Sequence, residues 1–260
     1  MTIDNGAVRL PGRFRLVALD GVDSTNLEAK RLAEDGAPDF TVVWAREQTA
    51  GRGRSGRTWL GGAGNLYFSI LLRPDYPPDQ AMQLGFVAAN AVADAVQTAL
   101  PSAHVHVKWP NDVLVEGKKI SGILMEGSLA AGRPAFDWLV LGVGVNVNAH
   151  PKTQDTHMPA TSLKAEGASG DALDAGRMLE TLAKRFLAGQ ATWAKLGFGP
   201  VRRHWLSRAQ GVGRRVTARL PRETVEGVFA ALDEGGALIL HLDSGEQRRI
   251  TAGDVFLAVR

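Results

Sequence analysis

The pattern of apolar and polar positions predicts alternating strands and helices over most of the chain. Short β-branched or aromatic runs are typical of strands, and apolar residues spaced three to four apart are typical of helices. One helix is expected to follow the polar segment 23–26 and to end at Gly36, which suits a C-cap. An alanine-rich helix is expected from Pro77 to about Leu100, and helices resume near Asp174. The expected strands cover residues 14–19, 41–45, 66–72, 104–109 and 136–145, with a hairpin over 112–127 that turns at Glu116 and Gly117.

The pattern changes near residue 210. From Val212 onwards, short β-rich runs are separated by Gly, Asp and Glu at hairpin spacing, which predicts a small β-barrel-like domain. We therefore expect a large domain over residues 1–210 and a small one over 211–260, which fits a length of 260 residues. Residues 149–170 are polar and show no sustained period, so a mobile surface loop is expected there.

Composition narrows the classes of function. The chain has no cysteine, which excludes a disulfide framework, a thiolate metal site and a cysteine nucleophile. It has no run approaching the roughly 18 apolar residues that span a bilayer, and its N-terminus does not resemble a signal peptide. A cytoplasmic protein without membrane contact is therefore expected. The net charge of +3 is too small to indicate nucleic acid, but it leaves room for a local cationic site.

A glycine- and arginine-rich segment, GRGRSGRT at residues 51–58, joins two expected strands. It fits the spacing of a dinucleotide-binding fingerprint and nearly fits a P-loop, but both motifs need a helix to open at the last glycines. A strand-like segment follows instead, so both interpretations are rejected. The remaining alternatives are a loop that binds polyphosphate or an acyl phosphate anhydride through Arg52, Arg54 and Arg57 and a solvated basic hairpin loop. An arginine-glycine segment for nucleic acid would need interleaved aromatic residues and longer repetition.

Other polar residues allow a functional and a structural interpretation. Lys108 ends an expected strand between two apolar residues, so it could hold a carboxylate and a phosphate, or it could guard the edge of a sheet. Lys118 and Lys119 lie in a hairpin turn and are expected to be solvated. Ser24, Thr25 and Asn26 could cap the following helix or, with Gln48, bind a small polar ring.

Two further features concern glycine and histidine. Gly142 and Gly144 lie inside an apolar strand, which indicates the close approach of a ligand or of a neighbouring backbone, or packing against a helix. His104 and His106 share one strand face, but no third ligand is spaced to complete a zinc site. No metal held by protein side chains is therefore expected.

Five segments in order along the chain closely resemble the bacterial biotin-protein ligases. They are DSTN (23–26), EQTAGRGRSGRTW (47–59), NLYFSILL (65–72), KWPNDVLVEGKKISGILME (108–126) and GVGVNVN (142–148). The resemblance implies an α+β fold, with a mixed β-sheet backed by helices as in class II synthetases and biotin ligases, followed by a small C-terminal SH3-like β-barrel. Many members carry an N-terminal winged helix that binds DNA. Only about twenty residues precede Asp23, so the resemblance points to the monofunctional form, with no DNA binding.

The resemblance also implies an activity. The expected enzyme uses ATP and Mg²⁺ to form biotinyl-5′-AMP from biotin. It then transfers biotin to a lysine of the biotin carboxyl carrier protein of acetyl-CoA carboxylase or of another biotin-dependent carboxylase. The oligomeric state stays open, with a homodimer among the alternatives. Lipoate ligation is the nearest rival activity, and a basic module that binds RNA is a rival of a different class.

The residues implied in this chemistry fall into three overlapping sets. Lys108 and Arg54 are implied in catalysis. Biotin is expected to contact Ser24, Thr25, Asn26, Gln48, Gly51, Arg52, Gly53, Arg54, Lys108, Gly122 and Ile123. The nucleotide is expected to contact Arg52, Arg54, Arg57, Trp59, Asn111 and Asn146. Met158 and Trp193 are candidates for stacking on adenine.

Overall fold

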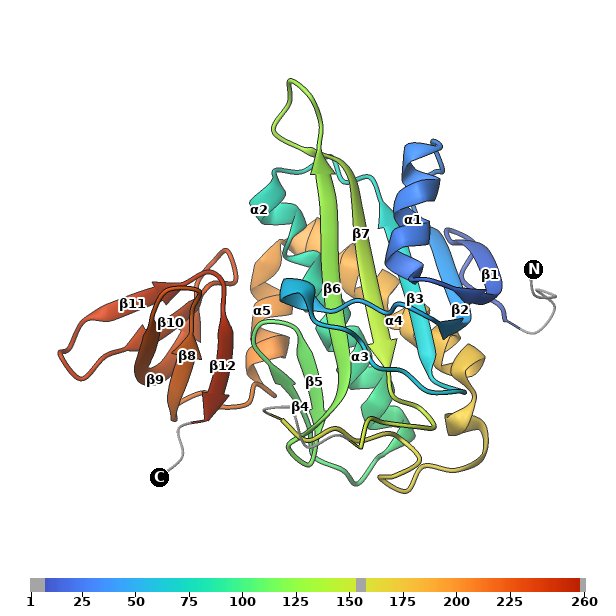
Figure 1. Cartoon of the computed structure of the whole chain (residues 1–260). Helices are drawn as coiled ribbons and strands as arrows, with labels where there is room; N and C mark the ends of the chain where they lie inside the picture. Colours follow the sequence, from blue (N-terminus) through green and yellow to red (C-terminus); the bar gives the residue numbers. More distant parts are fainter. Residues whose placement is uncertain (1–7, 153–157, 258–260) are drawn as a thin grey trace.

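A seven-stranded mixed sheet forms the centre of the larger part of the molecule (Figure 1). The structure is a computed structural model that describes residues 8–152 and 158–257. The strand order is β1-β2-β3-β7-β6-β5-β4, with β1 and β2 parallel and each later neighbouring pair antiparallel. The strands are β1 (Arg15–Val22), β2 (Thr41–Gln48), β3 (Leu66–Leu72), β4 (Val105–Lys108), β5 (Asp112–Val115), β6 (Lys118–Leu129) and β7 (Phe136–Val145). The expected mixed sheet is therefore confirmed.

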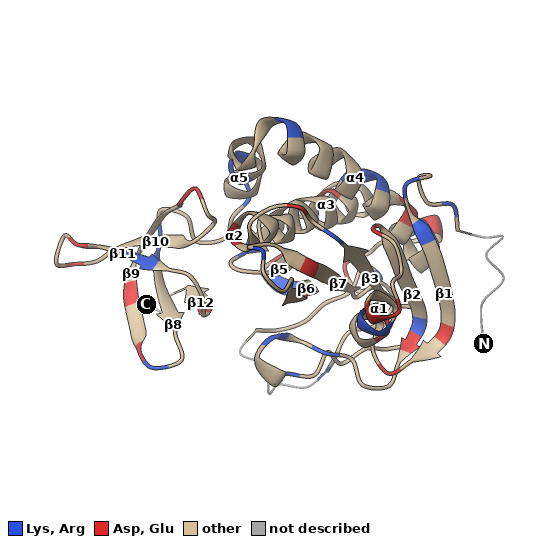
Figure 2. Ribbon diagram, turned by 90° about the horizontal axis from the view of Figure 1, so that it is seen from above, with Lys and Arg blue, Asp and Glu red and all other residues tan. Residues whose placement is uncertain are grey.

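Helices cover both faces of this sheet, as Figure 2 shows from above. On one face lie α3 (Leu84–Ala99), α4 (Ala175–Leu196) and α5 (Phe198–Leu206), above the main hydrophobic core. On the other face lies α1 (Thr25–Glu34), which buries Ala29 and Ala33 against strands β2, β3 and β7. The first turn of α1 lies beside the ends of these central strands.

The alanine-rich helix expected from Pro77 is interrupted. The structure has a single turn, α2 (Pro78–Ala81), and then α3, with the break at Met82 and Gln83. The buried Gln83 side chain accepts a hydrogen bond from Trp193 Nε1 at 2.8 Å and donates one to the Glu234 carbonyl at 3.2 Å. At this point the backbone keeps helical dihedrals but makes tighter hydrogen bonds, from Gln83 N to the Gln80 carbonyl and from Gly85 N to the Met82 carbonyl. Helical propensity alone could not indicate this interruption.

The hairpin expected at Glu116 and Gly117 is confirmed. Both residues have positive φ, 49° and 74°, as a tight two-residue hairpin turn requires. The expected surface loop over 149–170 is partly wrong, because Thr161, Ser162 and Leu163 are buried. Backbone hydrogen bonds join this segment to β6 and to the end of β7. Residues 153–157 of that expected loop lie outside the described residues.

The C-terminal part is a five-stranded antiparallel sheet. Its strands are β8 (Arg215–Arg219), β9 (Thr224–Leu232), β10 (Leu238–His241), β11 (Gln247–Ile250) and β12 (Asp254–Leu257), in the order β11-β10-β9-β8-β12. The small all-β unit is as expected, but the barrel is not closed, because β11 and β12 form the two edges. The boundary after residue 210 stays a prediction.

The turn between β9 and β10 fastens this sheet to the larger part of the molecule. The buried indole of Trp109 donates a hydrogen bond from Nε1 to the Gly236 carbonyl at 3.1 Å. A Cβ atom at Gly236 would lie 2.5 Å from the Phe86 ring, so only glycine allows this close contact. In the described ranges, no helix is long and apolar enough to cross a membrane.

Candidate active site

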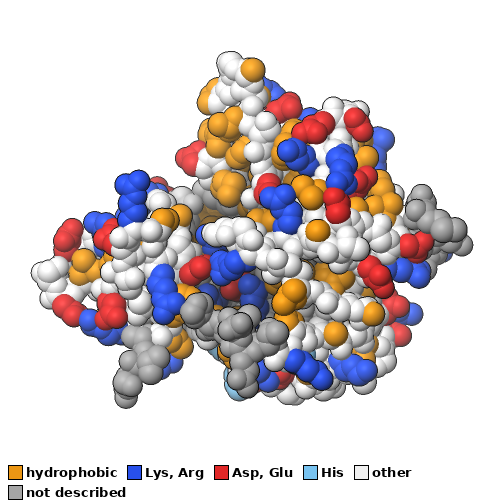
Figure 3. Space-filling view, in the orientation of Figure 1, with side chains coloured by type: hydrophobic (Ala, Val, Ile, Leu, Met, Phe, Trp, Pro, Cys, Tyr) orange, Lys and Arg blue, Asp and Glu red, His pale blue; other side chains and the backbone are white. Residues whose placement is uncertain are grey.

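A cavity of about 280 Å³ opens where the ends of the central strands, the glycine-arginine loop and the C-terminal sheet meet. Figure 3 shows basic side chains gathered in a hollow near the middle of this face. All but one of the residues implied in binding line this cavity: Ser24, Thr25, Asn26, Gln48, Arg52, Gly53, Arg54, Arg57, Trp59, Lys108, Asn111, Gly122, Ile123 and Asn146. Gly51 is the exception, and it lies against the Trp59 backbone, 2.6 Å from where its Cβ would be. The sequence therefore identified one real cavity.

The first turn of α1 forms a polar end of the cavity. Ser24 is the N-cap residue, but its side chain makes no capping hydrogen bond, so capping does not account for this polar segment. The Thr25 amide and hydroxyl donate to Gln48 Oε1, at 2.7 Å and 3.1 Å. The buried Ser69 hydroxyl on β3 lies 2.8 Å from Thr25 Oγ1. Hydrogen-bonding side chains thus converge from α1, β2 and β3 at this end.

The two glycines of β7 make room for side chains of this chain. A Cβ atom at Gly142 would lie 1.9 Å from Asn26 Oδ1, so the Asn26 amide packs directly over Gly142. Asn26 belongs to α1, so Gly142 agrees with the alternative that a glycine in this strand allows a helix to pack closely. A Cβ atom at Gly144 would lie 2.6 Å from the Trp59 indole, which also rests on Gly122. Gly144 therefore accommodates the close approach of the glycine-arginine loop.

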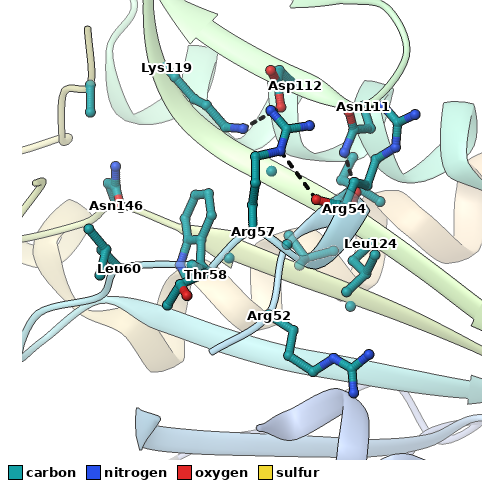
Figure 4. Close-up of a pocket in the computed structure, with 18 of the residues that line it drawn as sticks. Arg52, Arg54, Arg57, Thr58, Leu60, Asn111, Asp112, Lys119, Leu124 and Asn146 are labelled. Atoms are coloured by element: carbon teal, nitrogen blue, oxygen red, sulfur yellow. Dashed lines mark hydrogen bonds and ion pairs between the residues drawn. The ribbon is translucent and has the colours of Figure 1, made fainter. Parts of the chain in front are cut away.

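Two of the three arginines of this loop, Arg54 and Arg57, lie together, and Arg52 lies apart from them (Figure 4). Arg54 donates to Asn111 Oδ1 at 3.2 Å and lies 3.7 Å from Asp254, which also pairs with Arg57 at 3.1 Å. Arg52 extends away from Arg54 and Arg57 and contacts Glu126 on β6 at 2.9 Å. Burial lowers the pKa of Arg54, and the nearby Asp254 carboxylate opposes that effect.

Lys108 lies at the base of the cavity with only 5% of its surface exposed. Its Nζ is 3.6 Å from Asp112 and 5.1 Å from the centre of the Phe256 ring. Burial is the largest influence on Lys108 and lowers its pKa, while Asp112 opposes the change. Although β4 is the outermost strand, Val107 makes backbone hydrogen bonds with the segment at residues 208–210. Lys108 is therefore not an exposed edge lysine.

Several cavity residues were not identified from the sequence. Lys119 was expected to be solvated, but this is wrong, because its Nζ lies 2.6 Å from Asp112 and 5.6 Å from the centre of the Trp59 ring. Lys118 is more exposed and pairs with Glu166. The lysine nearer the strand interior turns inward, a difference that alternation along β6 could have indicated.

The C-terminal sheet also contributes to the cavity, through Asp254 and Phe256. No local sequence signal marks these residues, because they reach the cavity only when the two sheets dock. Asn146, which was predicted, donates from Nδ2 to the Thr161 carbonyl at 2.9 Å. Its buried Oδ1 has no hydrogen-bond partner within the described residues, which leaves an acceptor available at the cavity wall.

The charge of the cavity favours an anion. Five basic side chains and two carboxylates line it in the described part of the chain. No group of three or more His, Cys, Asp or Glu residues that could hold a metal occurs within residues 8–152 and 158–257. A small molecule that combines a polar ring with negatively charged oxygens fits both ends of the cavity.

Two protein-family models match the chain. The Biotin/lipoate A/B protein ligase family matches residues 19–146, and the Biotin protein ligase C terminal domain matches residues 211–258. The first match includes the glycine-arginine loop and Lys108, and the second covers the five-stranded sheet. The class defined by the fold and the cavity is thus that of protein ligases of the biotin/lipoate type.

Individual relatives narrow this class. The Biotin--[acetyl-CoA-carboxylase] ligase of Paracoccus denitrificans is 42% identical over 236 residues, which cover 90% of this chain and 97% of the relative. The Bifunctional ligase/repressor BirA of Bacillus subtilis is 33% identical, over 93% of this chain and 74% of that protein. The solved structure of the Aquifex aeolicus biotin protein ligase in complex with biotin and ATP matches with a TM-score of 0.78 and 30% identity, over 94% of this chain and 98% of that chain. The chain belongs to the biotin protein ligases.

Proposed function

We propose that this chain activates biotin with ATP to give biotinyl-5′-AMP and then transfers the biotinyl group to a lysine of a carrier protein. One observation carries the proposal: the cations Arg52, Arg54 and Lys108 line the same cavity as the polar end at Thr25 and Gln48. A molecule with a polar ring and a negatively charged anhydride fits such a cavity. The Aquifex relative, which was solved with biotin and ATP, supports the same choice of substrates.

The first step is a displacement at phosphorus. The biotin carboxylate attacks the α-phosphorus of ATP, a C(O)O–P bond forms, and the bond to pyrophosphate breaks. Both reactants are anionic, so the barrier falls when fixed cations neutralise the charge that builds up on the phosphoryl oxygens. Lys108 and Arg54 fill this role, because both are largely buried and need little reorganisation.

Other residues hold the two substrates. We assign Ser24, Thr25, Asn26 and Gln48 to the ureido ring of biotin, and Gly122 and Ile123 to the apolar slot beside it. The nucleotide is assigned to Arg57, Trp59, Asn111 and Asn146, where Asn146 Oδ1, which has no partner among the described residues, offers an acceptor to an amino group. Gly51, Arg52 and Gly53 belong to the loop that closes over the adenylate. A closed loop keeps water from the reactive anhydride.

A magnesium ion fits this cavity only as a companion of the nucleotide. Mg²⁺ is commonly bound by substrate phosphates and one or two carboxylates, and the described residues offer Asp112 and Asp254. Both carboxylates face basic side chains, so they suit an ion that arrives with the triphosphate. When bound there, the ion would neutralise phosphate charge.

The second step releases AMP. The amine of a carrier lysine attacks the acyl carbon of the adenylate, an amide bond forms, and the bond to AMP breaks. No nucleophile of this chain is needed. The carrier we propose is the biotin carboxyl carrier protein of acetyl-CoA carboxylase or of another biotin-dependent carboxylase, in keeping with the name of the Paracoccus relative.

Pyrophosphate exchange tests the first step. With radiolabelled pyrophosphate, label should enter ATP when biotin is present and should not when lipoate replaces it. Lys108→Ala should lose most of this exchange and keep its fold, whereas Lys118→Ala, a change at a more exposed lysine on β6 that does not line the cavity, should exchange normally. Exchange driven by lipoate alone, or normal exchange in Lys108→Ala, would refute the respective assignment. Transfer is tested separately with a carrier domain and with its version in which the acceptor lysine is replaced by arginine.

A further inference from the structure

A continuous chain of side-chain hydrogen bonds links the polar end of the cavity to the glycine-arginine loop. It begins at Gln48 and Thr25 and passes through the Ser69 hydroxyl, which lies 2.7 Å from Asn26 Oδ1. It then runs from Asn26 Nδ2 to Glu126 Oε2 at 2.8 Å, and from Glu126 Oε1 to Arg52 at 2.9 Å. We propose that Ser69, Asn26 and Glu126 form a hydrogen-bonded relay. Through this relay, a ligand bound to Thr25 strengthens the ion pair between Glu126 and Arg52.

The direction of each hydrogen bond follows from the chemistry of the groups. The Glu126 carboxylate only accepts, so the Asn26 amide must turn its NH₂ toward Glu126 and its oxygen toward Ser69. Gln48 Oε1 is also an acceptor, so the Thr25 hydroxyl donates its one hydrogen to Gln48. Ser69 therefore has a single hydrogen for two competing acceptors, Thr25 Oγ1 and Asn26 Oδ1.

Because of this competition, a ligand that binds Thr25 changes the strength of the bond between Ser69 and Asn26. An N–H donor of a ligand that binds Thr25 Oγ1 competes with Ser69 for this oxygen, so the Ser69 hydrogen is given more often to Asn26. A stronger bond to the Asn26 oxygen polarises the amide and strengthens the bond from its NH₂ to Glu126, because linked hydrogen bonds reinforce one another. Glu126 is then held more firmly where it faces Arg52.

The surroundings suit a transmitting role rather than simple packing. Ser69 and Asn26 are buried at 0% and 5% exposure, so water does not compete with their bonds. Gly142, which faces Ser69 across the β3–β7 pair, leaves the space that the Asn26 amide occupies. The last link, Glu126 to Arg52, is half-exposed and weak alone, so a modest strengthening upstream changes how often it forms.

The inference rests on the proposed function, because it takes biotin, whose ureido ring carries N–H groups, as the ligand at Thr25. Ser69 and Glu126 do not line the cavity, so they act as positioning residues. The expected result is that biotin increases nucleotide affinity through them, and that each ligand alone binds nearly as well without them. A merely structural role would instead weaken both ligands separately.

Calorimetry with α,β-methylene-ATP, which cannot be cleaved to pyrophosphate, measures this coupling. We expect saturating biotin to tighten binding of the analogue to the wild-type protein by at least about 5-fold, in the usual range for coupled sites. In Ser69→Ala and in Glu126→Gln this factor should fall below about 2-fold, while the affinity for the analogue alone changes by less than about 3-fold. The double variant should lose no more than either single variant, because both act in one chain of bonds.

Glu223→Gln is the matched control, because it removes a carboxylate from another ion pair, with Arg248 on the C-terminal sheet. It should keep the full coupling factor. Wild-type coupling in both Ser69→Ala and Glu126→Gln, or no coupling in the wild type, would overturn the relay while biotin binding still supports the proposed function. If the wild-type protein bound no biotin, the proposed function would fail first and the relay with it. Should Ser69→Ala not fold, the partly exposed Glu126→Gln decides the question alone.

Discussion

Replacing Lys108 by methionine should separate activity from stability. Lys108 is buried beside Asp112, and burial lowers its pKa. The charge on Lys108 therefore destabilises the folded protein. Lys108→Met removes the charge and keeps most of the side-chain volume. Asp112 is not left unpaired, because Lys119 Nζ stays 2.6 Å from it. We therefore expect a more stable protein that has lost its chemistry.

The magnitude follows from three contributions. Replacing a buried ion pair by apolar side chains is commonly neutral or stabilising by about 1–4 kcal/mol, and the cost of removing one partner alone is avoided here because Asp112 keeps Lys119. The cation contact with Phe256, at 5.1 Å, is lost, but a methionine sulfur makes a contact of similar strength with the ring. We expect a gain of about 1 kcal/mol, which raises Tm by about 2–4 °C in a protein of this size. Biotin-dependent pyrophosphate exchange should fall by about 100-fold or more, as when one stabilising donor is removed elsewhere.

The gain in stability should depend on pH. Below its lowered pKa, Lys108 is charged in both the folded and the unfolded chain, so the wild-type protein bears the full penalty. Between that pKa and the ordinary value of 10.5, the unfolded chain binds more protons, so wild-type stability rises with pH. The Tm advantage of Lys108→Met should therefore be largest near neutral pH and shrink toward pH 10.5. Thermal unfolding of both proteins across this range measures it, with the more exposed Lys118→Met as control. A variant destabilised by 1 kcal/mol or more, or one that still exchanges, would refute this reasoning.

Three further substitutions test a close contact at the cavity, the bond between the two sheets and the retention of the adenylate. Gly142→Ala should destabilise the protein by about 2 kcal/mol, because the new Cβ would overlap Asn26; adding Asn26→Ala should restore most of the loss in thermal unfolding. Trp109→Phe removes a buried hydrogen bond between the two sheets and should lose about 1 kcal/mol more than Trp44→Phe, whose buried Nε1 has no partner among the described residues. Arg54→Gly should release the adenylate faster, seen as AMP formed without carrier; unchanged release would count against its assigned role.

Elements bounded by clear turn residues were predictable from the sequence. The strands expected at 66–72 and 136–145 agree with β3 and β7 residue for residue, because each is an apolar run that ends at polar or turn-forming residues. The break in the alanine-rich helix was not predictable from propensity, because it lies where Gln83 bonds to Trp193 and Glu234, which are distant in sequence. Whether the C-terminal sheet closes was also beyond sequence patterning, since closure depends on how its edge strands meet.

The site was predictable to the extent that its residues lie in short motifs. Lys108 and the loop arginines were assigned through the motifs that carry the family resemblance, because their local patterns alone left a structural interpretation open, and these residues line one cavity. Asp254 and Phe256 were missed because they enter the cavity through docking of the second sheet. Lys119 was misread because neighbouring residues of a strand point to opposite faces, so Lys119 pairs with Asp112 at the cavity while Lys118 pairs with Glu166 away from it.

The ion pairs of the cavity also bear on how an anion would enter it. Asp254 faces Arg54 and Arg57, Glu126 faces Arg52, and Asp112 lies between the two lysines. These pairs keep the basic side chains in place without a ligand, which reduces the entropy that binding must overcome. The pairs of Asp254 with Arg54 and Arg57 are partly exposed, so they are weak enough to yield to a phosphate, which offers more oxygens to the same donors. A cavity lined in this way is therefore preorganised for a polyanion and can still exchange its internal carboxylates for one.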